Sequence, residues 1–266
     1  LESGLFEDFP RPDYNIALHD NAALPAGQIA WAPGFVMANV DSVDITVKGR
    51  GGHGAYPHDT IDPVVIAARI VGSLQTLVSR ELNPQEPGVV TVGAINAGTK
   101  HNIIPNEVTM MLTVRSYADE TREKLLSGIE RIAKAEAMVA GLDGDMLPIV
   151  TRSDQYTPAS YNDPELTARL KTVLEGVVGA ENMVAATPTM GGEDFARYGR
   201  EEPLIPSMMF WLGAVPQDVF DASRQPGGKP LPSLHSSEFY PDPDPTIETG
   251  VAAMTASAIN LLQAGG

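Results

Sequence analysis

The sequence contains no cysteine among its 266 residues. This absence excludes disulfides, zinc–thiolate sites and a cysteine nucleophile within the chain. It leaves both a reducing cytosol and a periplasm open, and of the two we expect the cytosol. Basic residues are also scarce, because 18 Lys and Arg stand against 34 Asp and Glu and give a formal net charge of −16. A polyanion of this kind repels nucleic acid and anionic membrane surfaces, so neither is an expected partner.

Long apolar runs are absent as well. No stretch of 18 or more apolar residues occurs, which excludes a membrane-spanning helix by sequence. Apolar residues make up 43% of the chain and charged residues 20%, as in ordinary globular proteins, and the length suits two modest domains or one large one. The N-terminus has neither a start methionine nor a signal peptide, so we expect the chain to begin inside a longer protein.

The middle of the chain predicts a βαββαβ unit. Val43, Ile45 and Val47 alternate with polar residues, and so do the apolar residues of 108–114, which indicates two half-buried strands. Asp62-Pro63 and Asp119 are typical helix starts, and we expect Asp119 to be an N-cap. With strands at 88–95 and 145–151, the order over about 41–151 is that of a ferredoxin-like domain.

The flanking segments predict an α/β domain that this unit interrupts. We expect an apolar strand at 14–19, an extended piece at 28–37, a helix at 163–178, a buried strand at 207–214 and a helix at 245–262. The packed face of the last helix is predicted to carry Val251, Met254, Ala258 and Leu261.

His19 and His235 have similar sequence settings, Leu-His-Asp and Leu-His-Ser. Each follows an apolar residue at what reads as the end of a buried strand, which is where an α/β enzyme presents metal ligands. Neutral imidazoles bind Zn, Mn, Co or Ni. The other interpretation is that each histidine makes an ordinary hydrogen bond. We expect the side chain of Asp20 to point away from His19, because neighbours in a strand face opposite sides.

Three further segments carry candidate site residues. His53 lies in the loop Gly49–Ala55, whose four glycines let backbone approach a ligand and leave the imidazole free to stabilise an oxyanion. Asn102 and Arg115 bracket a predicted strand, and we expect them to meet at one end of a hairpin and grip a carboxylate. Glu193, after two glycines, suits a pocket loop or a helix start. Each also has a plain interpretation, as a connector histidine, a turn asparagine, a surface arginine and a helix start.

Taken together, the motifs resemble the M20 family of metallopeptidases, in its aminoacylase, hippurate hydrolase and auxin-conjugate hydrolase branch. The residues that carry the resemblance are Gly-Leu-Phe-Glu at 4–7, Leu18-His19, 24–27, Met37-Ala38, Gly-Gly-His-Gly-Ala-Tyr-Pro-His at 51–58, Asp62-Pro63, Leu74-Gln75, 78–80, Ala97-Gly98, Asn-Ile-Ile-Pro at 102–105, Met-Gly-Gly-Glu-Asp-Phe at 190–195 and Leu-His-Ser at 234–236. They run along the whole chain in the family's order.

The resemblance implies a partial doubly wound α/β catalytic domain, at 1–38 and 152–266, with an inserted ferredoxin-like lid and dimerisation domain at 39–151. It implies a homodimer, two divalent metal ions and hydrolysis of N-acyl amino acids or related conjugates by metal-activated water. His19 and His235 match family metal ligands.

By the same resemblance, His53 matches the lid histidine that reaches the partner's active site. Asn102 and Arg115 match substrate or transition-state contacts, and Glu193 matches a pocket wall. The family's remaining metal ligands and its Glu-Glu general base lie upstream of the position that Leu1 matches, so we expect the chain alone to be inactive. The alternative is a non-catalytic dimerisation or binding module derived from this family.

Overall fold

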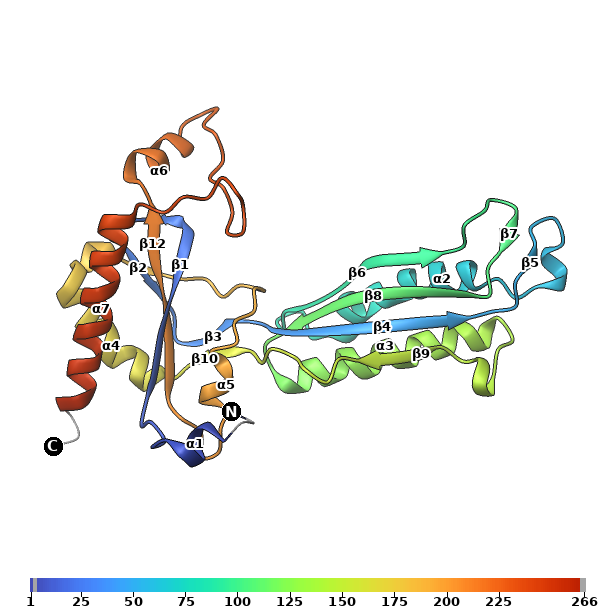
Figure 1. Cartoon of the computed structure of the whole chain (residues 1–266), viewed down its shortest axis with the longest axis horizontal. Coiled ribbons are helices and arrows are strands. Elements are labelled where there is room, and N and C mark those ends of the chain that lie inside the picture. Colours follow the sequence, from blue (N-terminus) through green and yellow to red (C-terminus); the bar gives the residue numbers. More distant parts are fainter. Residues whose placement is uncertain (2–3, 264–266) are drawn as a thin grey trace. The chain divides into compact units, whose positions relative to one another are not determined.

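The computed structural model describes Leu1 and residues 4–263 and divides into two compact units. Unit 1 comprises residues 1–36, 160–189 and 194–266, and unit 2 comprises residues 37–159 and 190–193. The predicted insertion at 39–151 therefore falls inside unit 2, which also holds a four-residue segment from much later in the chain. Figure 1 labels the elements of both units. Among the described residues, no helix has the length and apolarity needed to cross a bilayer.

Unit 2 is a four-stranded antiparallel sheet with the strand order β6-β8-β4-β9. Its elements are β4 (Asn39–Lys48), β5 (Gly52–His53), a 3-10 turn (Pro57–Asp59), α2 (Pro63–Thr76), a π-helical turn (Leu77–Glu81), β6 (Gly88–Ala97), β7 (Ile103–Ile104), β8 (Glu107–Ser116), α3 (Asp119–Val139), a 3-10 turn (Gly144–Met146) and β9 (Ile149–Arg152). This order of strands and helices confirms the predicted ferredoxin-like βαββαβ arrangement.

One core holds unit 2 together. Val43, Ile45 and Val47 of β4 are at most 1% exposed and pack with the apolar faces of α2 and α3. Because alternate strand residues face opposite sides, both helices cover the face of β4 that carries these residues. The helix α2 begins at Pro63, as the sequence predicted, and Asp62 caps it by accepting a hydrogen bond from Val64 N at 2.8 Å. The prediction for α3 was wrong: its N-cap is Ala118, and Asp119 is the first helical residue.

A buried ion pair lies at the end of unit 2 where β4 and α3 begin. The carboxylate of Asp41, 3% exposed, accepts hydrogen bonds from Arg122 at 2.6 to 3.1 Å, and the Tyr156 ring centroid lies 3.7 Å from the guanidinium carbon. The hydrogen bonds to Asp41 raise the pKa of Arg122, and burial opposes them. The Arg122 guanidinium of α3 thereby contacts both β4, through Asp41, and the segment after β9, through Tyr156.

Unit 1 is a mixed sheet with the strand order β1-β12-β2-β11. Its elements are α1 (Leu5–Asp8), β1 (Asn15–Pro25), β2 (Ile29–Trp31), β3 (Gly34–Met37, which runs into unit 2), β10 (Ser160–Asn162), α4 (Pro164–Val178), a 3-10 turn (Ala180–Asn182), β11 (Met183–Ala185), α5 (Ala196–Gly199), β12 (Ser207–Val215), α6 (Gln217–Ser223) and α7 (Pro243–Gln263). β1 and β12 run parallel, whereas β2 runs antiparallel to β12. This sheet with its helices confirms the α/β class of the flanking domain.

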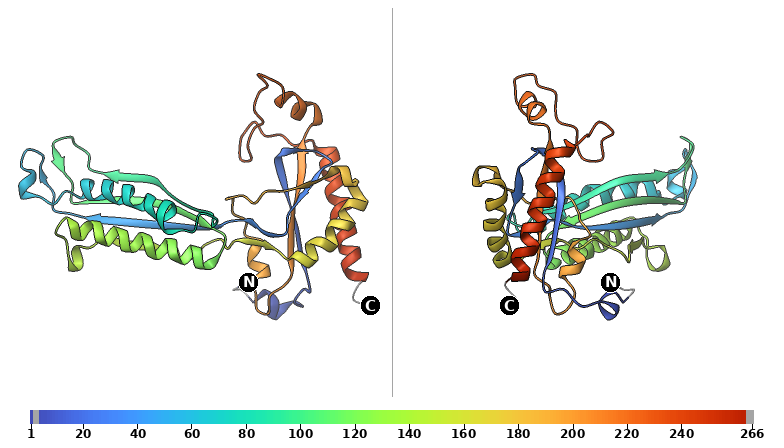
Figure 2. Two further views of the ribbon diagram at one scale, coloured as in Figure 1. Left: turned by 180° about the vertical axis from the view of Figure 1, so that it is seen from behind. Right: turned by 60° about the vertical axis from the view of Figure 1, so that its left-hand side comes forward.

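The helices α4 and α7 lie side by side in unit 1, as both views of Figure 2 show. Leu170 of α4, Phe210 of β12 and Ala253 of α7 are fully buried in their shared core. The close approach of chain segments is tightest at Gly213, where a Cβ would lie 1.7 Å from the carbonyl oxygen of Pro25. Only glycine fits at this point of β12.

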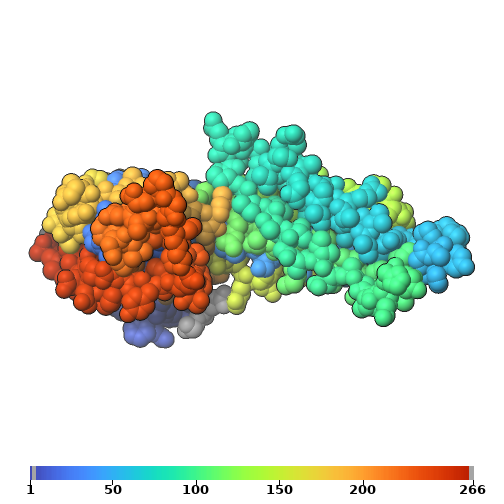
Figure 3. Space-filling model, turned by 90° about the horizontal axis from the view of Figure 1, so that it is seen from above, coloured from blue at the N-terminus to red at the C-terminus, as the bar shows by residue number. Residues whose placement is uncertain are grey.

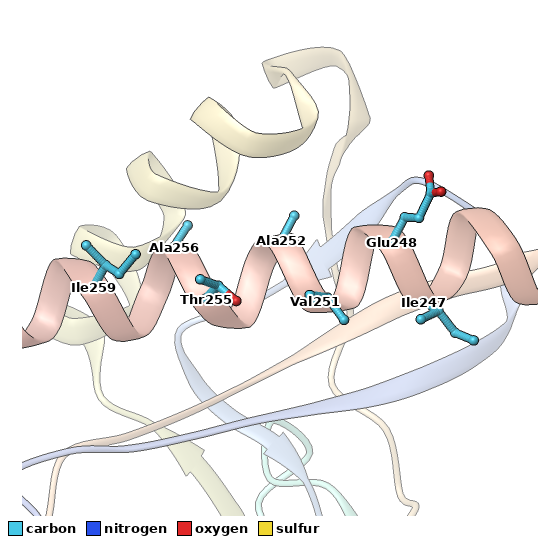
Figure 4. Close-up of a pocket in the computed structure, with 7 residues that line it drawn as sticks. All are labelled: Ile247, Glu248, Val251, Ala252, Thr255, Ala256 and Ile259. Carbon is cyan, nitrogen blue, oxygen red and sulfur yellow. The ribbon is translucent and has the colours of Figure 1, made fainter.

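The predicted packed face of α7 was partly wrong. Val251 is 62% exposed, while Gly250, Ala253 and Ser257 are the buried residues of the helix. Small side chains let α7 approach its neighbours closely, and this leaves larger apolar residues outside. Figure 4 shows this outer face, which Ile247, Glu248, Val251, Ala252, Thr255, Ala256 and Ile259 form.

Candidate functional site

His19 lies in the middle of β1, not at its end as the sequence predicted. It is the fifth of eleven strand residues, because β1 continues to Pro25, and it pairs with Trp211 of β12. Its Nδ1 lies 2.7 Å from the carbonyl oxygen of Asp20 and 3.2 Å from Asp20 Oδ1. The expectation that the Asp20 side chain points away was therefore wrong. A carbonyl oxygen only accepts, so Nδ1 carries a proton, and in a neutral ring the lone pair is on Nε2.

His235 lies in a turn on the loop between α6 and α7, not after a strand. It is exposed and has a φ of 65°, in the left-handed region where residues other than glycine are uncommon. This loop is tied to the carboxyl end of β12, because Asp242 N donates to Ala214 O at 2.8 Å. Figure 3 shows α6 and the loop after it, in orange, on the surface of unit 1. The Pro- and Gly-rich residues 215–233 indicate a long loop before His235, and the structure has α6 and a loop there.

The described residues contain no group of three or more His, Cys, Asp and Glu side chains that could hold a metal ion. His19 offers an Nε2 lone pair of the kind that binds a divalent metal, and His235 offers an exposed imidazole. Two imidazoles do not by themselves make a two-metal centre. The part of the chain that the structure describes therefore does not form the complete site that the family resemblance implies.

His53 and Asn102 lie together at one end of unit 2. His53 of β5 pairs with Ile103 of β7, and Gly54 N donates to Asn102 O at 2.8 Å. A Cβ at Gly54 would lie 3.1 Å from Asn102 O, which is a tight contact. The side chains of His53 and Asn102 are both exposed. We call β5 (Gly52–His53) and β7 (Ile103–Ile104), with the loops that flank them, the arm of unit 2.

The proton of His53 is placed opposite to that of His19. His53 Nδ1 accepts a hydrogen bond from the amide of Ala55 at 3.1 Å, so a neutral ring carries its proton on Nε2. The ring also lies 5.3 Å, centroid to centroid, from that of Tyr56. His53 thus presents an N–H donor at the exposed arm, whereas His19 presents a lone pair.

Arg115 does not meet Asn102, and the prediction that they share one sheet end was wrong. Arg115 is near the end of β8, whereas Asn102 precedes the start of that strand. Glu107 and Arg115 are eight residues apart on a continuous strand, a distance of about 27 Å. The reversal that joins β6 to β8 lies at the Asn102 end, and the sequence pattern alone did not reveal how long the hairpin is.

The guanidinium of Arg115 is bonded within unit 2. Its Nε donates to Thr113 Oγ1 at 3.2 Å, and its Nη1 donates to the carbonyl oxygen of Met190 at 2.9 Å. Glu193, half-buried, lies in irregular backbone just after Met190, and α5 begins only at Ala196. Of the two expectations for Glu193, the structure supports the loop rather than the helix start.

Comparison with known proteins gives the same family from sequence and from fold. Residues 38–140 match the model of the peptidase dimerisation domain of the M20 family. The chain is 38% identical over 212 residues to an N-acetyldiaminopimelate deacetylase of Leuconostoc citreum, covering 80% of this chain and 53% of the relative. It is 32% identical over 247 residues to thermostable carboxypeptidase 2 of Saccharolobus solfataricus, covering 93% and 58%.

Solved structures agree with these matches. A putative aminohydrolase from methicillin-resistant Staphylococcus aureus has a TM-score of 0.79 at 26% identity, over 97% of this chain and 61% of that one. The YXEP protein of Bacillus subtilis, titled a dinuclear metal binding peptidase from the M20 family, has a TM-score of 0.69 at 23% identity, over 98% and 59%. The chain thus spans little more than half the length of the proteins it matches. On its sequence motifs, its dimerisation-domain match and its fold, the chain belongs to the M20 family.

Proposed function

We propose that this chain works in a metal-dependent amidohydrolase that cleaves the amide bond of N-acyl amino acids or related conjugates. The observation that carries the proposal is the arm of unit 2, which presents an Nε2–H of His53 beside the exposed Asn102. A preorganised N–H donor stabilises the negative charge that develops on a carbonyl oxygen when water adds to the carbonyl carbon. The C–N bond then breaks, and the products are a carboxylate and an amine.

The arm is proposed to act on the active site of a partner subunit. Unit 2 matches a dimerisation-domain model, and we infer a homodimer through this unit. Arg115 stands about 27 Å along β8 from the start of that strand, so one protomer cannot bring Arg115 and the arm to one substrate without large movement. A site shared between two protomers would separate the contacts in this way.

The relatives favour an amide substrate. Their names include deacetylases of N-acetyldiaminopimelate, which is an N-acyl amino acid, and carboxypeptidases, which cleave a peptide amide bond. Asn102 and Glu193 are the proposed substrate contacts, and His19 and His235 are the proposed metal ligands. Arg115, which donates to Met190 O, is proposed to hold the segment that carries Glu193. Two divalent ions, Zn, Mn, Co or Ni, belong to the proposal, and they need donors beyond those that the described residues bring together.

A second candidate function is a non-catalytic dimerisation or binding module. The observation that favours it is the absence of a metal-ready group of side chains among the described residues. The two candidates separate in an assay of the complete protein against a panel of N-acyl amino acids, with metal analysis. Hydrolysis that a chelator abolishes supports the enzyme, and no hydrolysis by a metal-loaded protein supports the module.

A variant of the arm tests the mechanism. We expect His53→Ala in the complete protein to lower turnover by roughly 10²-fold or more while the bound metal is retained, since one oxyanion donor is lost. His58→Ala is the matched control, because His58 is exposed on the same arm and its ring centroid lies 6.2 Å from that of Tyr56. Unchanged turnover in His53→Ala contradicts the oxyanion role.

Mixed dimers test action on the partner subunit. The His53→Ala and His235→Ala homodimers should each have little or no activity. After subunit exchange, each hybrid dimer has one active site in which the intact His235 of one subunit meets the intact His53 of the other. These hybrids should recover part of the activity. No recovery, with hybrid formation verified by mass spectrometry, contradicts catalysis across the dimer.

A further inference from the structure

The segment Met190–Glu193 belongs to unit 2, although it follows the rest of that unit by thirty residues. It lies against the end of the sheet where β4 begins and β8 ends. Val40 of β4 and Arg115 of β8 are directly paired there and so share one face of the sheet. This face is opposite to the one that carries Val43, Ile45 and Val47, so the helices do not cover it.

Three successive residues of the segment are matched to this sheet end. Arg115 Nη1 donates to Met190 O at 2.9 Å, and Ala38 N donates to Gly191 O at 2.8 Å. At Gly192 a Cβ would lie 2.2 Å from Val40 Cγ2, so the bare backbone fits where a side chain would not. The residue that follows is Glu193.

The sheet end itself is well fixed. Asn39 and Ser116 are fully buried and bond each other twice, from Asn39 Nδ2 to Ser116 Oγ at 2.8 Å and from Ser116 N to Asn39 Oδ1 at 3.0 Å. Thr113 Oγ1 accepts from Arg115 Nε and holds the guanidinium from its other side. Arg115 therefore joins a fixed frame to a segment of irregular backbone.

We propose that Arg115 is a positioning residue, which holds Met190 and thereby sets where unit 2 presents Glu193. The guanidinium does this through two donors on one planar group, Nε to the frame and Nη1 to the segment. Because these two nitrogens already donate to protein oxygens, loss of function on substitution of Arg115 does not by itself identify a substrate contact. The inference concerns the geometry of unit 2 and holds whether or not the proposed hydrolysis is correct.

Hydrogen exchange of the Ala38 amide tests this inference directly, because that amide is protected by Gly191 O. We expect Arg115→Gln to raise the exchange rate at Ala38 by roughly 10- to 100-fold, the range for loss of a hydrogen bond to a charged group. The amides of Val43 and Ile45, inside β4, should stay protected. Arg152→Gln is the matched control, since it removes an arginine that pairs with the exposed residue Glu123. Unchanged protection of Ala38 in Arg115→Gln overturns the proposal.

A second variant covers the case in which Arg115→Gln opens β4 as a whole. Arg115→Lys keeps the charge and the aliphatic stem but has a single ammonium in place of the two-donor plane. We expect an intermediate rise in exchange at Ala38, with Val43 still protected. Wild-type protection at Ala38 in Arg115→Lys overturns the claim that the guanidinium geometry is needed.

Activity gives an independent reading where hydrolysis can be measured. A positioning residue predicts that Arg115→Lys lowers kcat/KM equally for an N-acyl amino acid and for its methylamide, which has no free carboxylate. A loss confined to the carboxylate-bearing substrate overturns the proposal, because Arg115 would then act on the substrate itself. Failure of the hydrolysis assay leaves the exchange result intact, so the two proposals fail separately.

Discussion

Unit 2 and unit 1 differ in how far their own residues enclose their apolar surface. In unit 2 the core residues of the sheet and of both helices form one cluster, and Asp41 with Arg122 closes its end. In unit 1 the helix α7 leaves Ile247, Val251 and Leu262 more than 60% exposed along its length, whereas in unit 2 the large apolar residues exposed this far, Met138 and Val139, adjoin at the end of α3. Exposed apolar patches favour association with other surfaces. We therefore expect unit 2 to be the more stable of the two, and the following variants are chosen to test that contrast.

The largest effect is expected for Asp41→Asn. This change leaves the guanidinium of Arg122 without its counter-ion, and we expect unit 2 to lose about 3 kcal/mol of its free energy of unfolding. Exchange of amides in β4 and β8 measures unit 2, while fluorescence measures unit 1, because both tryptophans, Trp31 and Trp211, lie there. The tryptophan transition should not move.

The control for Asp41→Asn is Glu123→Gln, which breaks the exposed pair with Arg152 and should cost less than about 1 kcal/mol. Equal losses in the two variants would show that the buried pair contributes no more than a surface pair.

The pKa of Arg122 is raised, so the contribution of the pair is present below the guanidinium's unfolded pKa and is lost only as pH rises through its folded pKa.

An intermediate effect is expected for Gly213→Ala in unit 1. The added Cβ meets backbone at Pro25 O, which cannot rotate away, and overpacking of this kind costs about 1–3 kcal/mol. The urea midpoint of the tryptophan transition should fall. Gly176→Ala in α4, where nothing lies within 4 Å of the new Cβ, should instead stabilise by up to about 1 kcal/mol. If Gly213→Ala also exposes the amides of β4, the two units do not unfold separately.

The smallest effect on stability is expected for Val251→Ser on the outer face of α7. Its side chain is already 62% exposed, so we expect a change within about 0.5 kcal/mol. Binding of an apolar dye should nevertheless decrease. Ala253→Ser, at a fully buried position of the same helix, should lower stability without lowering dye binding. Unchanged dye binding in Val251→Ser would show that this face is not the surface that sets the two units apart.

Much of the fold could be predicted because its signals are local. The alternation of Val43, Ile45 and Val47 and the Asp62-Pro63 pair at a helix start indicate strand and helix without reference to distant residues. The face of α7 could not be predicted in this way, since the helix is apolar on several sides and small residues decide which side is buried. The acidic side chain of Asp119 led to the wrong N-cap prediction for α3, because the N-cap is Ala118.

The candidate site was predicted as a set of residues but not as an arrangement. His53 and Asn102 do lie together, since β5 pairs with β7 over two residues only. Arg115 was misplaced because the position of a hairpin turn decides which residues meet, and a ten-residue strand separates its ends widely. The tautomers of His19 and His53 depend on single backbone groups, of Asp20 and Ala55, which no sequence pattern reports.

The segment Met190–Glu193 also affects how this architecture can be recombined. The chain passes between its two units at 36/37, 159/160, 189/190 and 193/194, so unit 2 is not one continuous cassette. A chimera that exchanged only residues 37–159 between two homologues would seat a foreign segment against Ala38, Val40 and Arg115. Transplanting 190–193 together with 37–159 would keep these contacting residues matched. Substitutions in the two stretches should therefore depend on each other during evolution.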